Sequence, residues 1–112
     1  MVEEPTPTDP VVRVDGDPSS PVVRLAGEID VFNARLLDDA LTRLLETDPD
    51  QVVVDLSGVR FLDSTGLSVL VRTRRRLRNW NAFVLAAPNA DVRRTLDVSG
   101  LMRHFTVVDQ AA

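Results

Sequence analysis

Residues 51–70 read QVVVDLSGVRFLDSTGLSVL, and this stretch decides the fold. It begins with an apolar run at residues 52–56, which is typical of a strand covered on both faces. Residues 57–62 are expected to form a loop, and a helix is expected at 64–79, where apolar residues recur at helical spacing. A buried strand followed by a helix is the repeating unit of a parallel α/β sheet.

Towards the N-terminus, two short apolar runs flank a turn-forming cluster that contains two prolines and a glycine. These runs, 11–14 and 22–26, are expected to form an antiparallel pair of strands. The spacing of leucines then predicts a helix from Asn33, with Asn33 or Asp30 as its cap and a stop at residues 48–49. An antiparallel hairpin is therefore expected before the parallel part of the sheet.

Towards the C-terminus, the pattern predicts a buried strand at 82–86, a short helix that ends at Gly100 in a left-handed conformation, and a last strand at 105–108. The expected order is β-β-α-β-α-β-α-β. This order indicates a single α/β domain with a mostly parallel central sheet of about four to five strands and helices packed against it. The expected organisation is a flexible N-terminal tail at 1–10, a domain at 11–108 and a short C-terminal tail at 109–112.

The composition excludes several classes of protein. The 112 residues include no cysteine, which excludes disulfides, zinc–thiolate sites and cysteine nucleophiles. His104 is the only histidine, which excludes a site with several histidine ligands. No apolar run approaches the roughly 20 residues that span a bilayer, and the acidic start is unlike a secretory signal. We therefore expect a cytoplasmic domain without metal, cofactor or membrane contact.

Charge is distributed unevenly along the chain. The net charge is −4, but residues 1–63 hold fourteen acids and five arginines, whereas residues 64–112 hold three acids and eight arginines. The main cationic cluster lies near the end of the second predicted helix, where arginines complement the helix dipole and cover a solvated face. The acidic total also argues against direct nucleic-acid binding. The cluster consists of Arg72, Arg74, Arg75, Arg76 and Arg78.

Candidate chemistry lies at the start of that helix, in the sequence DSTGL at residues 63–67. Small polar side chains at a helix start can simply cap it. An exposed hydroxyl there, beside outward-pointing backbone N–H groups, also suits a phosphoryl acceptor or a ligand contact. A hydrolase with Ser64 as nucleophile and His104 as base lacks the Gly-x-Ser-x-Gly elbow, so no catalytic residue and no enzymatic activity are expected.

Three motifs in this order resemble the STAS family, and in particular its single-domain members, the bacterial anti-sigma factor antagonists. The motifs are GEID at 27–30 followed by the helix from Asn33, then VVVDL at 52–56 running into FLDSTGL at 61–67, and LDVSGL at 96–101. Together they extend over roughly residues 11–108. The resemblance implies a STAS-like fold.

The resemblance to the STAS family also implies a switch between protein partners. In the family, the serine after the aspartate is phosphorylated by an anti-sigma factor that is also a serine kinase, and a serine phosphatase reverses this. Here that position is Ser64. The unphosphorylated protein binds the anti-sigma factor and releases the sigma factor. The implied partner-binding residues are Asp30, Asn33, Asp63, Ser64, Thr65, Gly66 and Leu67.

The resemblance leaves other roles open. Some STAS modules are subunits of lipid-transport ATPase complexes, and others are small-ligand sensors. In this chain Ser68 stands where many relatives carry glycine, which changes how closely a partner backbone approaches. For the switch itself, a phosphoryl group beside Asp63 is expected to act at the interface and leave the fold intact, because a helix start tolerates negative charge.

Overall fold

The computed structural model describes residues 11–110, which form a five-stranded sheet and three α-helices. The elements are β1 (Val11–Asp17), β2 (Ser20–Ile29), α1 (Ala34–Glu46), β3 (Val52–Leu62), α2 (Ser64–Arg76), β4 (Phe83–Ala86), α3 (Ala90–Val98) and β5 (Thr106–Val108). Two short 3-10 helices, η1 (Trp80–Ala82) and η2 (Leu101–His104), precede β4 and β5. The predicted tail at 1–10 and residues 111–112 of the predicted C-terminal tail lie outside the described residues.

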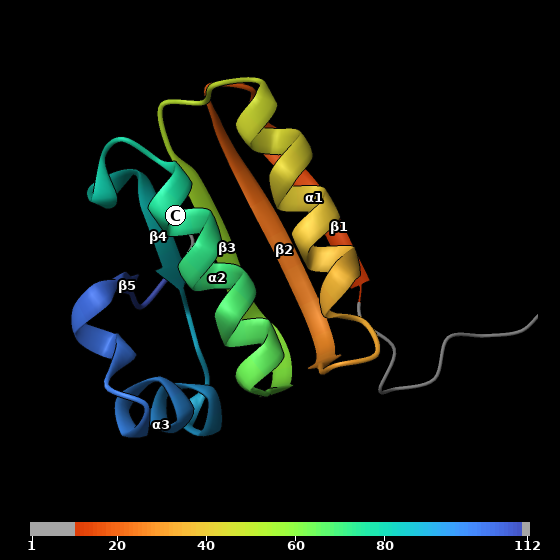
Figure 1. Ribbon diagram of the computed structural model, residues 1–112, viewed down its shortest axis with the longest axis vertical. Helices are drawn as coiled ribbons and strands as arrows, with labels where there is room; N and C mark the ends of the chain where they lie inside the picture. The colour runs from red at the N-terminus through yellow and green to blue at the C-terminus, as the bar shows by residue number, and fades with distance from the viewer. Residues whose placement is uncertain (1–10, 111–112) are drawn as a thin grey trace, which may run out of the picture.

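The strands lie in the sheet in chain order, from β1 at one edge to β5 at the other (Figure 1). β1 pairs antiparallel with β2, and every later neighbour pairs in parallel. Each parallel step has a helix in its crossover, which is how the chain returns to start the next strand. This confirms the predicted α/β class, the N-terminal hairpin and the mostly parallel sheet.

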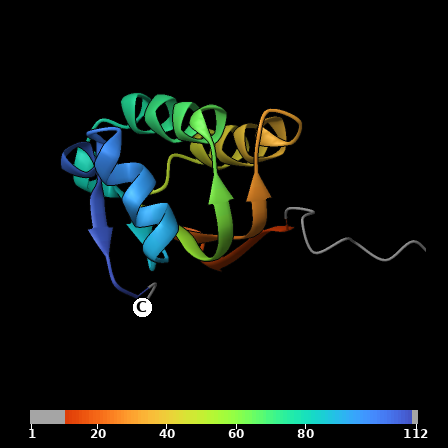
Figure 2. The same cartoon turned by 90° about the horizontal axis from the view of Figure 1, so that it is seen from below.

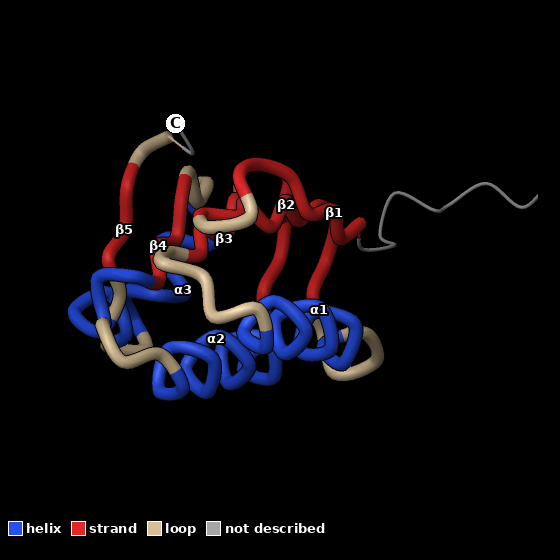
Figure 3. Tube along the Cα trace, turned by 90° about the horizontal axis from the view of Figure 1, so that it is seen from above, coloured by secondary structure: helices blue, strands red, loops and turns tan. Residues whose placement is uncertain are grey.

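Helices cover only one face of the sheet. α1 and α2 lie side by side on that face, and α3 lies at the lower end of the sheet in Figure 1 (Figures 2 and 3). The interface between the layers is the hydrophobic core, which includes Val23, Leu25, Ile29, Leu37, Leu41, Val52, Val54, Leu56, Leu62, Leu70, Phe83, Leu85 and Leu96.

The opposite face of the sheet has no helix over it within residues 11–110 (Figure 3). Side chains of β2 accordingly alternate between buried and half-buried positions. The expectation that residues 52–56 form a strand covered on both faces was wrong. Val53 and Asp55 point away from the helical layer, and they are screened by neighbouring strands rather than by a helix.

The two central strands are longer than the sequence predicted. Residues 57–62, expected to form a loop, continue β3 to Leu62, and β2 runs past Gly27 to Ile29. The register between them shifts twice, which allows pairing to continue through the two glycines. Gly27 has a φ of 91°, and a Cβ on Gly58 would lie 2.9 Å from the carbonyl oxygen of Leu25. These glycines therefore permit an irregular, close strand pair beyond the predicted ends of the two strands.

Helix ends follow local chemistry. Gly100 has a φ of 77°, as predicted for a left-handed residue after α3. α2 ends at Arg76 rather than at residue 79, because Leu77 adopts an extended conformation. Asn33 precedes α1 but makes no side-chain capping bond to it. No helix in the described residues is both long and apolar enough to cross a membrane.

Candidate partner-binding site

Parallel pairing brings the two predicted site segments to one corner of the molecule. Ile29 and Leu62 are paired at the carboxyl ends of β2 and β3, so the loops that follow these strands leave the sheet side by side. The backbone N–H of Asp63 donates to the carbonyl oxygen of Ile29 over 3.1 Å. Residues 34 positions apart in the sequence are thereby joined at the start of α2.

Asp63 is the N-cap of α2 and is held by several donors. Its Oδ1 atom accepts the backbone N–H groups of Thr65 at 2.9 Å and Gly66 at 3.2 Å, and it also accepts the Thr65 hydroxyl. Burial alone raises the pKa of Asp63, but these hydrogen bonds, with one from the backbone N–H of Val31, outweigh burial and lower the pKa below its ordinary value. The carboxylate therefore remains charged beside Ser64.

Ser64 is the first residue of α2 and is exposed. Its hydroxyl has no hydrogen-bond partner among residues 11–110, whereas its carbonyl oxygen accepts the Ser68 hydroxyl over 2.9 Å. The sequence left open whether these polar residues cap the helix or leave outward-pointing backbone N–H groups for a ligand. The structure shows the cap, because the Asp63 carboxylate accepts the N–H groups of both Thr65 and Gly66. What the helix start presents is an accessible hydroxyl next to a fixed negative charge.

The loop before α1 is ordered by its own polar side chains. Asn33 accepts the backbone N–H of Asp30 with its Oδ1 and donates from Nδ2 to the carbonyl oxygen of Glu28, both over 2.9 Å. Asp30 Oδ1 in turn accepts the backbone N–H of Phe32 over 3.0 Å. The structure thus uses Asp30 and Asn33 to shape the loop rather than to cap α1 with a side chain.

The remaining two predicted site residues lie inside the corner. Leu67 is only 6% exposed. Gly66 is buried where a Cβ would lie 2.4 Å from Leu62 Cδ1 and 3.0 Å from Ile29 Cγ2. Gly66 therefore allows α2 to pack closely against the ends of β2 and β3. This close packing fixes the position of Ser64 relative to the sheet.

Shallow grooves flank α2 on both sides. One groove, of about 270 Å³, lies between α1 and α2 and includes Val31 and Thr65 in its lining. The other, of about 520 Å³, lies between α2 and the segment at Ser99 and Leu101, with Ser64 at its edge. Ser68 and Arg72 line both grooves, and Arg72 forms an ion pair with Asp38 of α1 at 3.7 Å.

Apolar side chains at this corner were missed by the sequence analysis. Phe61 is 50% exposed, because β3 continues through it and turns it away from the core. Phe32 is 92% exposed and Val31 is 64% exposed. The sequence does contain a sign of this exposure. Val31 and Phe32 lie in a four-residue loop between a strand and a helix, where neither can reach a core position.

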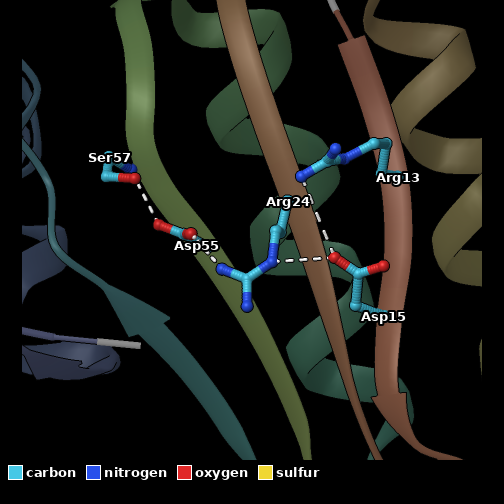
Figure 4. A network of polar contacts seen from close by, with 5 residues as sticks. All are labelled: Arg13, Asp15, Arg24, Asp55 and Ser57. Atoms are coloured by element: carbon cyan, nitrogen blue, oxygen red, sulfur yellow. Dashed lines mark hydrogen bonds and ion pairs between the residues drawn. The ribbon is translucent and has the colours of Figure 1, made fainter. Parts of the chain in front are cut away.

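A second polar cluster, also missed, lies on the open face of the sheet (Figure 4). Arg24 donates from Nη1 to Asp55 over 2.7 Å and from Nε to Asp15 over 2.9 Å, which links β1, β2 and β3. Asp55 also accepts the backbone N–H of Ser57 over 3.0 Å. Burial raises the pKa of Asp55, but the bonds from Ser57 and Arg24 outweigh it and lower the pKa. These carboxylates and arginines neutralise each other, which is typical of a structural network.

The fold and this corner define the class of protein. The family model for the STAS domain matches residues 10–111, so the chain belongs to the STAS domain family, as its sequence motifs predicted.

Relatives with assigned names are similar over most of the chain. The anti-sigma-F factor antagonist RsfB of Mycobacterium tuberculosis is 33% identical over 84 residues, which cover 75% of this chain and 69% of that protein. The crystal structure of an anti-sigma factor antagonist from Mycobacterium paratuberculosis has a TM-score of 0.87 at 30% identity, covering 95% of this chain and 91% of that one. Bacillus SpoIIAA in its phosphorylated form shares the fold, with a TM-score of 0.66 at 18% identity, over 87% of this chain and 90% of that one.

Proposed function

We propose that this protein is an anti-sigma factor antagonist. It binds an anti-sigma factor that is also a serine kinase and so releases a sigma factor, and phosphorylation of Ser64 ends the interaction. The observation that carries the proposal is the exposed Ser64 hydroxyl at the first residue of α2, which lies beside the charged cap Asp63 and has no hydrogen-bond partner within residues 11–110. The names of the 33% and 30% identical relatives support the same role. The protein is then a regulator acted upon by other proteins rather than an enzyme.

The chemical step is phosphoryl transfer from ATP. The Ser64 oxygen forms a bond to the γ-phosphorus, the bond to the β-phosphate oxygen breaks, ADP leaves, and the hydroxyl proton passes to a base of the kinase. A serine phosphatase restores the hydroxyl by hydrolysis. Within residues 11–110 no hydrogen bond has to be broken before the Ser64 hydroxyl can react.

The physical basis of the switch is desolvation at the interface. A phosphoryl group adds a charge of about −1.5 to −2 at neutral pH. In a complex that buries Ser64, this charge loses water and lies next to the Asp63 carboxylate. A loss of about 3 kcal/mol, typical of an unpaired buried charge, weakens binding more than about a hundredfold.

The test uses the full chain and each serine-kinase anti-sigma factor encoded in the same genome. Incubation with ATP should add one phosphate, located on Ser64 by mass spectrometry, and none to a Ser64→Ala variant. Ser64→Glu should weaken binding more than about a hundredfold in calorimetry. Ser19→Glu, at an exposed serine in the turn between β1 and β2, at the opposite end of β2 from this corner, is the matched control and should leave binding nearly unchanged. Undiminished binding by Ser64→Glu, or phosphate on another residue, contradicts the proposal.

A further inference from the structure

The wider of the two grooves beside α2 lies between that helix and residues 99–101, and we call it the arginine groove. Its volume is about 520 Å³, and Ser64 lines it at the start of α2. Phosphorylation involves only Ser64, so the other lining residues take no part in that step. They are Leu67, Ser68, Val71, Arg72, Arg75, Ser99 and Leu101.

Three apolar side chains contribute to the lining of the arginine groove. Leu67 is only 6% exposed, and Val71 and Leu101 are half-buried and pack against the hydrophobic core. The part of their surface that faces the groove is held in place by this packing. An apolar side chain laid on it would leave water without any rearrangement of the core, which is favourable.

The charges that line the arginine groove have one sign. Within residues 11–110, its charged lining residues are Arg72 and Arg75. α2 contains four arginines and no acid, and residues 99–104 on the other side of the groove contain one arginine, one histidine and no acid. The acids that flank these two segments in the sequence, Asp63 and Asp97, do not line the groove. The groove is therefore complementary to negative charge.

Arg75 is the arginine that can receive an acidic group. Arg72 is already paired with Asp38 of α1 at 3.7 Å. Arg75 is exposed, and the ion pairs within residues 11–110 do not include it. A guanidinium donates hydrogen bonds and accepts none, so its partner must be an acceptor such as a carboxylate.

The length of the arginine groove favours an elongated occupant. Ser64 and Arg75 both line it, and their separation along α2 corresponds to about 16 Å of helix. A peptide segment of about five extended residues has this length. An occupant that reaches from Ser64 to Arg75 is therefore an extended protein segment rather than a compact anion.

We propose that an acidic segment of the partner protein lies in the arginine groove, with a carboxylate on Arg75 and an apolar side chain against Leu67, Val71 and Leu101. This inference rests on the proposed function, because it names the chemistry that the partner presents beside Ser64. A partner that covers Ser64 already lies at one end of the groove, since Ser64 belongs to its lining. The groove then extends the binding surface from the switch residue along α2.

The test measures, by calorimetry, binding of the full chain to each serine-kinase anti-sigma factor of the same genome. Arg75→Glu should weaken binding at least about 30-fold, because it replaces an attraction with a repulsion. Arg75→Lys keeps the positive charge and should stay within about fivefold of wild type. Arg43→Glu makes the same charge change at an exposed position of α1 outside both grooves, and as the matched control it should stay within about threefold.

Two further measurements locate the effect. The thermal midpoint of Arg75→Glu should stay within about 5 °C of wild type, because the side chain is exposed, so a loss of affinity is not a loss of fold. In an NMR titration with the kinase, backbone amide shifts should change at residues 71–75 and 99–101 as well as at Ser64. Changes that stop at Ser68 and leave residues 99–101 unaffected would overturn the inference.

The outcomes separate this inference from the proposed function. If the wild-type chain binds none of these kinases, the proposed function fails and the inference fails with it. If wild type binds and Arg75→Glu binds equally well, the proposed function stands and the acidic segment is wrong. Equal losses in Arg75→Glu and Arg43→Glu show an effect of overall charge and also overturn the inference. A wild-type dimer in analytical ultracentrifugation that Arg75→Glu converts to monomer overturns it in favour of a second copy of this chain.

Discussion

Asp63 has two roles at the scale of a single residue. It caps α2 through the backbone N–H groups of Thr65 and Gly66, and it is the fixed negative charge next to Ser64. The same hydrogen bonds that form the cap lower the pKa of Asp63, so the capping group carries its negative charge at neutral pH. The helix start is therefore stabilised by the same group that makes added phosphate unfavourable in an interface.

Alanine and asparagine at position 63 together should separate these roles, because alanine removes both the cap and the charge and asparagine removes only the charge. The loss of the cap should lower the free energy of unfolding by about 1–2 kcal/mol, measured by urea denaturation at pH 7. Asp63→Asn should retain much of this stability, because asparagine is an equally good cap. Asn89, which caps α3 through the backbone N–H of Val92, provides a matched control in Asn89→Ala. A change below about 0.3 kcal/mol for Asp63→Ala contradicts the role of the cap.

Replacing Gly66 with alanine tests how closely α2 packs against the ends of β2 and β3. Alanine is the better helix former by about 1 kcal/mol, yet its Cβ would lie 2.4 Å from Leu62 Cδ1 and 3.0 Å from Ile29 Cγ2. Leu62 is 2% exposed and has little room to move, so overpacking should win and Gly66→Ala should lower stability by about 1 kcal/mol net. Adding Leu62→Val to Gly66→Ala should cost less than the sum of the two single changes. Strict additivity in that double-mutant cycle contradicts the steric explanation.

At the scale of elements, sequence patterning predicted which segments are helices and strands but not how far the central strands extend. The leucine spacing of α1 and the apolar run that starts β3 are local signals, and both predictions were confirmed. Continuation of β3 to Leu62 depends on pairing with β2 across two register shifts, which no local window contains. The same non-local pairing turns Phe61 outward and brings the Asp30 loop to Ser64.

The edge of the sheet depends on the network around Arg24. Asp55 contacts both Arg24 and Ser57, and its folded pKa is lowered. A lowered carboxyl pKa gives stability that is present above the unfolded value, near 3.9, and is lost as the pH falls through the folded value. Stability should therefore be nearly constant from pH 7 to about 5 and should fall steeply below about 4.

Asp55→Asn should lower stability at pH 7 by about 1–2 kcal/mol, because a charge-assisted hydrogen bond in a half-buried position becomes neutral. The decline of stability in acid should also be shallower in this variant, as one of the titrating groups is gone. Urea denaturation at pH 7, 5 and 3.5 measures both effects. Asp39→Asn, at an exposed position of α1, is the control and should follow the wild-type curve. An Asp55→Asn curve parallel to wild type contradicts the contribution of the network to acid sensitivity.

At the scale of the whole molecule, the question is whether phosphate on Ser64 acts through the fold or through the interface. Ser64 is exposed and its hydroxyl makes no bond within residues 11–110, so the phosphate replaces no stabilising contact. The helix dipole favours the added charge by about 0.3–1 kcal/mol, and repulsion from Asp63 opposes it by a similar amount in water. These opposing contributions leave the free energy of unfolding almost unchanged.

The phosphorylated chain should therefore keep its fold while losing its partner. Backbone amide shifts in an NMR comparison should change at residues 30–33 and 61–70 and stay fixed in β4 and β5. The thermal midpoint should move by less than about 5 °C, which corresponds to less than about 1 kcal/mol, whereas loss of binding corresponds to about 3 kcal/mol. Shift changes spread through the sheet core would place the switch in the fold instead. With the changes confined to the corner, the interface alone distinguishes the two forms, and the sheet serves to hold the start of α2, and with it Ser64, in place.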